Sequence, residues 1–274
     1  MKSSKAVLAL ALGIGFCLHA GCSNATPEKP TPEAAKQFLK LRGYDFDEES
    51  FLSAARSGDA MVVGAFLTAG MDPNVKSKDT GATALISAAA RGDATIVNTL
   101  LAGGADVNRK DEGGGTALMR ALEHKENEVA DILFARPELD VNAQGGNGVT
   151  LLMRYVWQNR DDAVEKLIER GARVDVEDSE GDTALHGAAQ AGNAHIVQLL
   201  LAKGVDPNVK NKVGGTALMW AAIYDRQEVA RILLQNGANP ALKDTDGLTA
   251  AAWAQKNKRD EMVKLLNEAT ASRK

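Results

Sequence analysis

The chain has 274 residues, a formal net charge of −4 at pH 7 and 45% hydrophobic residues, of which few are aromatic. The balanced charge and the lack of long basic runs argue against nucleic acid as a partner. Both cysteines, Cys17 and Cys22, lie near the start. The remainder therefore has no thiol, which excludes a disulfide framework and suits an oxidising compartment.

Residues 1–21 have the pattern of a secretory signal peptide. Lys2 and Lys5 precede an apolar run over residues 6–18, which is too short for a permanent membrane-spanning helix. Residues 18–22 (LHAGC) resemble a bacterial lipobox, although His19 departs from its pattern. The resemblance implies acylation of Cys22 and a periplasm-facing lipoprotein, with the outer membrane favoured. Cleavage after residue 25 is the alternative, and it would leave a soluble periplasmic or secreted protein.

Residues 22–35 are rich in proline and poor in apolar side chains, which predicts an extended tether. Residues 36–46 are expected to form an N-terminal capping segment. It would pack on the first repeat through Phe38, Leu39, Leu41 and Phe46. The tail, residues 270–274, is polar and predicted to fray.

The rest of the chain is built from an internal repeat. A threonine followed by an apolar run recurs with spacings of 33, 34, 33, 33 and 33 residues, at Thr83, Thr116, Thr150, Thr183, Thr216 and Thr249. In the clearest copy, residues 181–208, Thr183 is placed to cap a first helix, and Gly192 and Gly204 are placed to end a first and a second helix. Such short helices are unstable alone. The period therefore predicts a stack of helix pairs that bury their faces on one another.

These motifs resemble the ankyrin-repeat family. The residues that carry the resemblance are the G-x-T-A-L start, the Ala-Ala pair at residues 88–89 and 188–189, the mid-repeat glycine and the G-A-D-V-N close at residues 104–108. The resemblance implies an all-α repeat solenoid of about seven helix-turn-helix repeats with β-hairpin loops, elongated and curved. The repeats would fill residues 47–269, divided at about 47–80, 81–113, 114–147, 148–180, 181–213, 214–246 and 247–269.

Repeats three and four are irregular. We expect Asn127 and Arg160-Asp161 to stand where other repeats have the mid-repeat glycine, and Tyr155-Val156 replaces the alanine pair of repeat four. Bulky residues at a position of close helix approach should alter the local stacking.

The sequence offers little chemistry. His186 and His195 occupy positions that the family uses structurally, and no Cys or His pair has metal-ligand spacing. The glycine runs lack the Lys-Ser/Thr of a phosphate loop, and no serine stands in a nucleophile elbow. We therefore expect no catalytic residue, no metal site and no cofactor.

What remains is a binding surface. The resemblance implies a partner on the concave side, where first helices end and hairpins project. Trp157 and Tyr224 stand out there, because aromatic side chains dominate binding hot spots. Trp157 could equally fill a gap in irregular repeat four, and Trp220 and Trp253 are expected mainly to pack between repeats. The candidate partner-binding residues are Arg91, Glu123, His124, Trp157, Gln158, Asp182, Gln190, Lys212, Ile223, Tyr224 and Leu248.

The predicted function is a non-catalytic protein–protein interaction module of the bacterial cell envelope. It would be monomeric, would contact the membrane only through a lipid anchor at Cys22, and would bind a protein partner. Two alternatives stay open, a protective or inhibitory factor for a periplasmic enzyme, and an exported effector that acts on a host or competitor protein. An enzyme would need titratable side chains gathered in a pocket, and the sequence scatters them.

Overall fold

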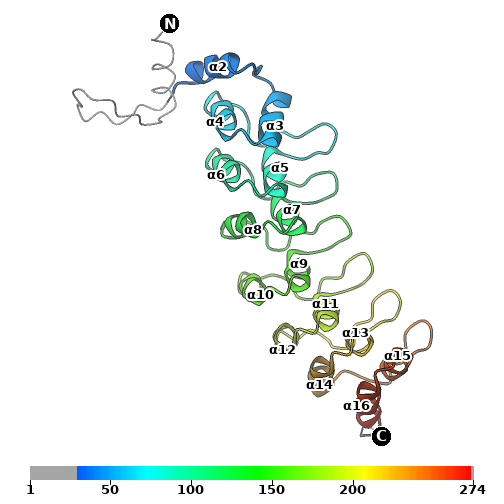
Figure 1. Ribbon diagram of the computed structural model, residues 1–274. Coiled ribbons are helices and arrows are strands. Elements are labelled where there is room, and N and C mark those ends of the chain that lie inside the picture. Colours follow the sequence, from blue (N-terminus) through cyan, green and yellow to red (C-terminus); the bar gives the residue numbers. More distant parts are fainter. Residues whose placement is uncertain (1–29, 273–274) are drawn as a thin grey trace. The chain divides into compact units, whose positions relative to one another are not determined.

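The computed structural model describes residues 30–272, which form fifteen helices joined by hairpin-like loops (Figure 1). Within that range the hairpins make isolated β-bridges, such as Lys110 with Thr116, and no longer strand. The chain divides into two compact units, with the boundary between Leu139 and Asp140. We call them unit 1 and unit 2. The predicted signal peptide, its alternative cleavage sites and Cys22 lie outside the described residues.

Unit 1 consists of an N-terminal helix and three helix pairs. Its helices α3, α5 and α7 follow one another in a row and carry the hairpins, and we call them inner helices; α4, α6 and α8 form the second row (Figure 1). The bounds are α2 (Pro32–Leu41), α3 (Glu48–Ser57), α4 (Ala60–Thr68), α5 (Ala84–Ala90), α6 (Ala94–Ala102), α7 (Ala117–Glu123) and α8 (Asn127–Phe134).

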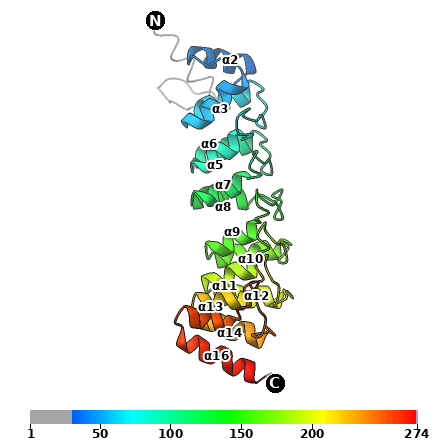
Figure 2. The ribbon, with the colours of Figure 1, turned by 90° about the vertical axis from the view of Figure 1, so that its right-hand side faces the viewer.

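Unit 2 consists of four helix pairs with the same arrangement, whose inner helices are α9, α11, α13 and α15 (Figure 1). Figure 2 shows the succession of helices in this unit from the side. The bounds are α9 (Leu151–Trp157), α10 (Asp161–Glu169), α11 (Ala184–Ala191), α12 (Ala194–Ala202), α13 (Ala217–Ile223), α14 (Gln227–Gln235), α15 (Ala250–Lys256) and α16 (Asp260–Ala271). The chain is thus an all-helical repeat solenoid, as the sequence predicts.

The recurring threonines start the inner helices. Thr150 has an extended backbone, and its hydroxyl oxygen accepts a hydrogen bond of 3.2 Å from the backbone N–H of Met153. Thr83, Thr116, Thr216 and Thr249 cap in the same way. Each hydroxyl therefore satisfies an N–H that the first turn would otherwise leave without a partner.

The turn between the two helices of a pair needs a residue with a left-handed backbone conformation, that is, with a positive φ. Gly92 and Gly192 supply it with φ of 72° and 85°. The expectation that Asn127 and Arg160 replace this glycine is wrong, because Lys125 and Asn159 occupy the left-handed position, with φ of 62° and 58°. Asp225 and Lys258 do the same in the last two pairs. The conformation of the turn is thus kept even where a side chain makes it costly.

The core lies between the two rows of helices in each unit. The alanine pairs are fully buried, which lets the inner helices approach closely, and Leu100 and Leu200 are buried in the second helices. In repeat four the replacements Tyr155 and Val156 are also buried. Within residues 30–272, no helix is both long enough and apolar enough to cross a bilayer.

The N-terminal segment differs in part from its prediction. Helix α2 begins at Pro32, so the last residues assigned to the tether form its first turn. Phe38 and Leu39 are buried, and α2 packs against α4. Leu41, however, is 65% exposed, and Phe46 is 42% exposed although its ring stacks on that of Phe66 in α4.

Candidate partner-binding surface

In unit 1 the predicted residues lie at the ends of two inner helices. Arg91 caps the C-terminal end of α5, Glu123 is the last residue of α7, and His124 caps the end of α7. All three are exposed. Glu123 also forms an ion pair of 2.7 Å with Arg120, one turn earlier on the same helix.

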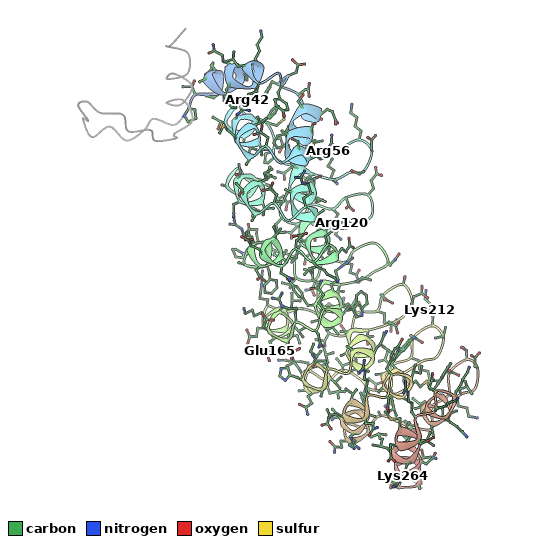
Figure 3. All side chains as sticks on the ribbon, in the orientation of Figure 1. Arg42, Arg56, Arg120, Glu165, Lys212 and Lys264 are labelled. Atoms are coloured by element: carbon green, nitrogen blue, oxygen red, sulfur yellow. The ribbon has the colours of Figure 1, made fainter. Side chains whose placement is uncertain are left out.

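Arg120 is held between two carboxylates. Arg120 lies on α7 and is labelled in Figure 3. Its Nε and Nη2 both lie 2.7 Å from Oδ2 of Asp111 in the preceding hairpin, and its Nη1 contacts Glu123. Partial burial alone would lower the pKa of Arg120, but the hydrogen bonds to Glu123 and Asp111 outweigh it and raise the pKa. The inner face of unit 1 therefore satisfies its own charges at this point.

In unit 2, Trp157 both packs and faces solvent. A Cβ added to Gly187 of α11 would lie 2.6 Å from the indole Nε1 of Trp157, so the ring rests directly against that glycine. The side chain is nevertheless 49% exposed. The packing interpretation is therefore confirmed for one edge of the ring, which fills the space above Gly187, and the rest of the ring is exposed to solvent.

Tyr224, at the end of α13, is fixed by two neighbours. Its hydroxyl accepts a hydrogen bond of 3.3 Å from the amide of Gln190 on α11. Its ring stacks on Trp220, with centroids 6.1 Å apart and planes at 26°. Tyr224 remains 41% exposed. We call Trp157, Trp220 and Tyr224 the aromatic strip. It crosses the consecutive inner helices α9, α11 and α13, of which α9 and α13 each pack against α11.

The hairpin candidates of unit 2 lie at the bases and tips of their loops. Asp182 accepts a hydrogen bond of 2.9 Å from the side chain of Asn211 in the next hairpin. Lys212, labelled in Figure 3, donates its backbone N–H to the carbonyl oxygen of Glu180 at 2.9 Å. Leu248 donates its N–H to Asp244. Adjacent hairpins are therefore tied together, and they present Lys212 and the 58% exposed Val213 at a tip.

The structure brings only some of the candidates together. Gln190 and Tyr224 are in direct contact, whereas Gln158 and Ile223 are half-buried at the ends of α9 and α13. Three neighbours were not among the candidates, namely Trp220, Arg120 and Gly187. A comparison of the fourth residue after each capping threonine would have found all three, because this position changes most between repeats. Its residues are, in chain order, Ser87, Arg120, Arg154, Gly187, Trp220 and Trp253.

The buried His186 has a structural role. Its Nδ1 accepts the backbone N–H of Thr183 at 3.1 Å, so Nε2 carries the proton and donates to the carbonyl oxygen of Gly215 at 3.2 Å. Burial lowers the pKa of His186, and the carboxylate of Asp182 and the bond to Gly215 offset this only in part. Across residues 30–272, no group of three or more His, Cys, Asp or Glu side chains could hold a metal ion.

These features define an all-helical repeat protein with an exposed, preorganised surface along its inner helices. The family model described as "Ankyrin repeats (3 copies)" matches residues 51–145, 152–244 and 187–273. The chain belongs to the ankyrin-repeat family, since these matches cover more than half of it. Ankyrin repeats are in general protein–protein interaction modules and in general non-catalytic. No curated protein matched the sequence.

Proposed function

We propose that this protein is a non-catalytic binding module of a bacterial cell envelope, and that the inner face of unit 2 binds a protein partner. One observation carries the proposal. Trp157 and Tyr224 are large, half-exposed aromatic side chains, and Gly187, Gln190 and Trp220 already hold them in place.

Preorganisation matters because binding then orders few side chains. An immobilised side chain costs about 0.5–1.5 kcal/mol on association, and the contacts of Tyr224 with Gln190 and Trp220 have already restricted it. Tryptophan and tyrosine are also the residues most enriched among binding hot spots. The ankyrin repeats of the chain support the choice of a protein as the partner.

The envelope location rests on the sequence alone. An apolar run behind two lysines, followed by LHAGC, favours export and acylation of Cys22. Several acyl chains would make the anchor effectively permanent, whereas one would hold only weakly. Incorporation of labelled palmitate tests this part. The wild type should carry label and Cys22→Ala should not, and label retained by Cys22→Ala would refute an anchor at that residue.

The binding site can be tested by capture from envelope extracts with the wild type and two variants. Trp157→Ala combined with Tyr224→Ala should weaken binding of the captured partner by about 30-fold or more, since hot-spot truncations cost about 2 kcal/mol or more. The matched control is Gln198→Ala combined with His195→Ala on the exposed side of α12. Equal losses in the two variants would show that the aromatic strip is not the binding site.

A further inference from the structure

Two asparagines of the chain are followed directly by glycine, in the pairs Asn147-Gly148 and Asn236-Gly237. Asn147 lies at the tip of the hairpin before α9, and Asn236 follows the last residue of α14. Both asparagines are exposed, and both glycines have a positive φ, of 73° and 95°. In an Asn-Gly pair the asparagine side chain reacts most readily with the backbone, because glycine has no Cβ to shield its nitrogen.

The backbone hydrogen bonds of the two pairs are alike. The N–H of Gly148 donates to the carbonyl oxygen of Gly145 at 3.2 Å, and the N–H of Gly237 donates to the carbonyl oxygen of Leu234 at 3.3 Å. Neither the bond of the glycine nitrogen nor the exposure of the asparagine therefore distinguishes the two pairs.

The two asparagine side chains are held differently. Nδ2 of Asn236 donates to the carbonyl oxygen of Ile232 at 2.8 Å, which ties the amide to the last turn of α14. In the described part of the chain, no hydrogen bond engages the side chain of Asn147. Residues 145–146 before it are both glycine, which leaves the backbone wide conformational freedom. The amide of Asn147 can therefore turn towards the nitrogen of Gly148, whereas that of Asn236 must first break a hydrogen bond.

We propose that Asn147 is a site of spontaneous deamidation. The backbone nitrogen of Gly148 forms a bond to Cγ of Asn147 and gives up its proton, the bond from Cγ to Nδ2 breaks, and ammonia leaves with that proton. The succinimide that results takes up one water from the solvent. Opening at Cγ gives aspartate. Opening at the backbone carbonyl carbon gives isoaspartate, in which the main chain runs through Cβ and Cγ and is one atom longer.

Asn147 also holds a contact between two hairpins. Its backbone carbonyl oxygen accepts the N–H of Ser179, in the next hairpin of unit 2, at 2.7 Å. The corresponding contact of the following hairpins runs from the N–H of Lys212 to the carbonyl oxygen of Glu180 at 2.9 Å. Because isoaspartate lengthens the main chain at this point, it displaces the carbonyl group, and the bond from Ser179 is lost.

The new carboxylate also meets like charge. Asp178 and Glu180 stand on either side of Ser179 in the chain, and like charges on the tips of adjacent hairpins repel each other. Asn147 lies shortly before Thr150, the N-cap of α9. Deamidation therefore loosens the contact between the first two hairpins of unit 2, directly before the inner helix that carries Trp157.

The test is ageing of the purified full chain at mildly alkaline pH, which favours loss of the proton from the glycine nitrogen. Peptide mass spectrometry after increasing times locates deamidation, and labelling by an isoaspartyl methyltransferase identifies the product with the longer main chain. Asn147 should react about tenfold faster than Asn236, since the second site must first give up its side-chain hydrogen bond. The urea-unfolded chain is the matched control, in which the two sites should react at similar rates.

Two results would overturn the proposal. One is a rate at Asn147 in the folded chain that is equal to or below the rate at Asn236. The other is a difference of the same size in the unfolded chain, because it would come from the neighbouring residues instead of the fold. Neither outcome depends on whether the inner face of unit 2 binds a protein, so the proposed function is tested separately.

Hydrogen exchange tests the structural consequence. The N–H of Ser179 should exchange faster in the deamidated fraction, whereas the N–H of Lys212, bonded to Glu180, should keep its protection. Asn147→Gln is the matched variant, because its longer side chain closes a larger ring more slowly, and after the same ageing it should retain the protection of Ser179. Equal loss of protection in the aged wild type and the aged variant would contradict the role of Asn147.

Discussion

Units 1 and 2 use the same repeat and leave different groups on their inner helices. In unit 1, Arg120 reaches from α7 to Asp111 and Glu123, so the charges on this face are paired within the repeat. In unit 2, the same position holds Arg154 on α9, Gly187 on α11 and Trp220 on α13, and the indole of Trp157 lies against Gly187. The comparison shows that the residue four positions after the capping threonine can change from a charged to an aromatic side chain with no change in the backbone pattern of the repeat.

The largest effect should come from the core, where the two units are equivalent. Leu100 of α6 and Leu200 of α12 hold the same place in the repeat and are both fully buried. Substitution of either by alanine should lower the free energy of unfolding by about 2–5 kcal/mol. Hydrogen exchange should show faster opening first in the substituted unit, because each repeat is stabilised by its neighbours. Equal loss of protection in both units would contradict nearest-neighbour stabilisation.

Substitution of the hairpin aspartates should affect the stability of the two units differently. Asp111→Asn turns an amide towards the guanidinium of Arg120 and should lower the free energy of unfolding by about 1–3 kcal/mol. Asp178→Asn, at the same position of unit 2, should cost less than about 1 kcal/mol, since within residues 30–272 the hydrogen bonds of Asp178 come from backbone N–H groups to Oδ1, and an asparagine oxygen can still accept them. Urea titrations of the two variants measure the difference. A larger loss for Asp178→Asn would mean that this carboxylate already has a partner within the chain.

Acidification should destabilise unit 2 through His186. Burial keeps the pKa of this imidazole below its ordinary value, so the unfolded chain takes up a proton that the folded chain does not. The free energy of unfolding should therefore be at its full value above about pH 6.5 and fall as the pH decreases below it.

The matched variant is His186→Met, because methionine stands at this position in the neighbouring repeats as Met153 and Met219. Urea titrations between about pH 7.5 and pH 5.5 should show a smaller pH dependence in this variant than in the wild type. An unchanged pH dependence would assign the effect to other groups.

The smallest effect concerns the turns. Lys125 of unit 1 has φ of 62°, and Lys125→Gly should raise the free energy of unfolding by about 0.5 kcal/mol, because glycine adopts this conformation without strain. Asn159→Gly of unit 2 should bring no gain. Asparagine tolerates the left-handed region, and Oδ1 of Asn159 accepts a bond of 2.7 Å from Asn193 that glycine would lose. Thermal unfolding of both variants measures the two effects.

The sequence predicted the fold well because the same residues mark the start and the buried face of the inner helix in successive repeats. Six in-phase threonines become helix caps, and the alanine pairs become the buried contacts between inner helices. The position of the turn in repeats three and four was missed. The expected replacements, Asn127 and Arg160, lie just after the turn, because the chain keeps the register of the repeat and places Lys125 and Asn159 in the left-handed conformation.

The surface was predicted less completely. Exposed aromatic side chains at helix ends can be predicted from their position within the repeat, as Trp157 and Tyr224 were. Contacts between the side chains of a hairpin and those of the following inner helix could not be predicted from the sequence of a single repeat. The recurrent contact between an inner helix and its hairpin carboxylate appears only when Asp111 with Arg120 and Asp244 with Trp253 are compared in space.

Site-specific photocrosslinking in cells tests the central claim most directly. A photoreactive amino acid would replace Ile223 at the end of α13 or Ala90, which holds the same position at the end of α5 of unit 1. We predict a discrete protein adduct from position 223 that Trp157→Ala with Tyr224→Ala abolishes, and little or none from position 90. An adduct only from position 90, or equal adducts from both positions, would contradict the assignment of the binding surface to unit 2.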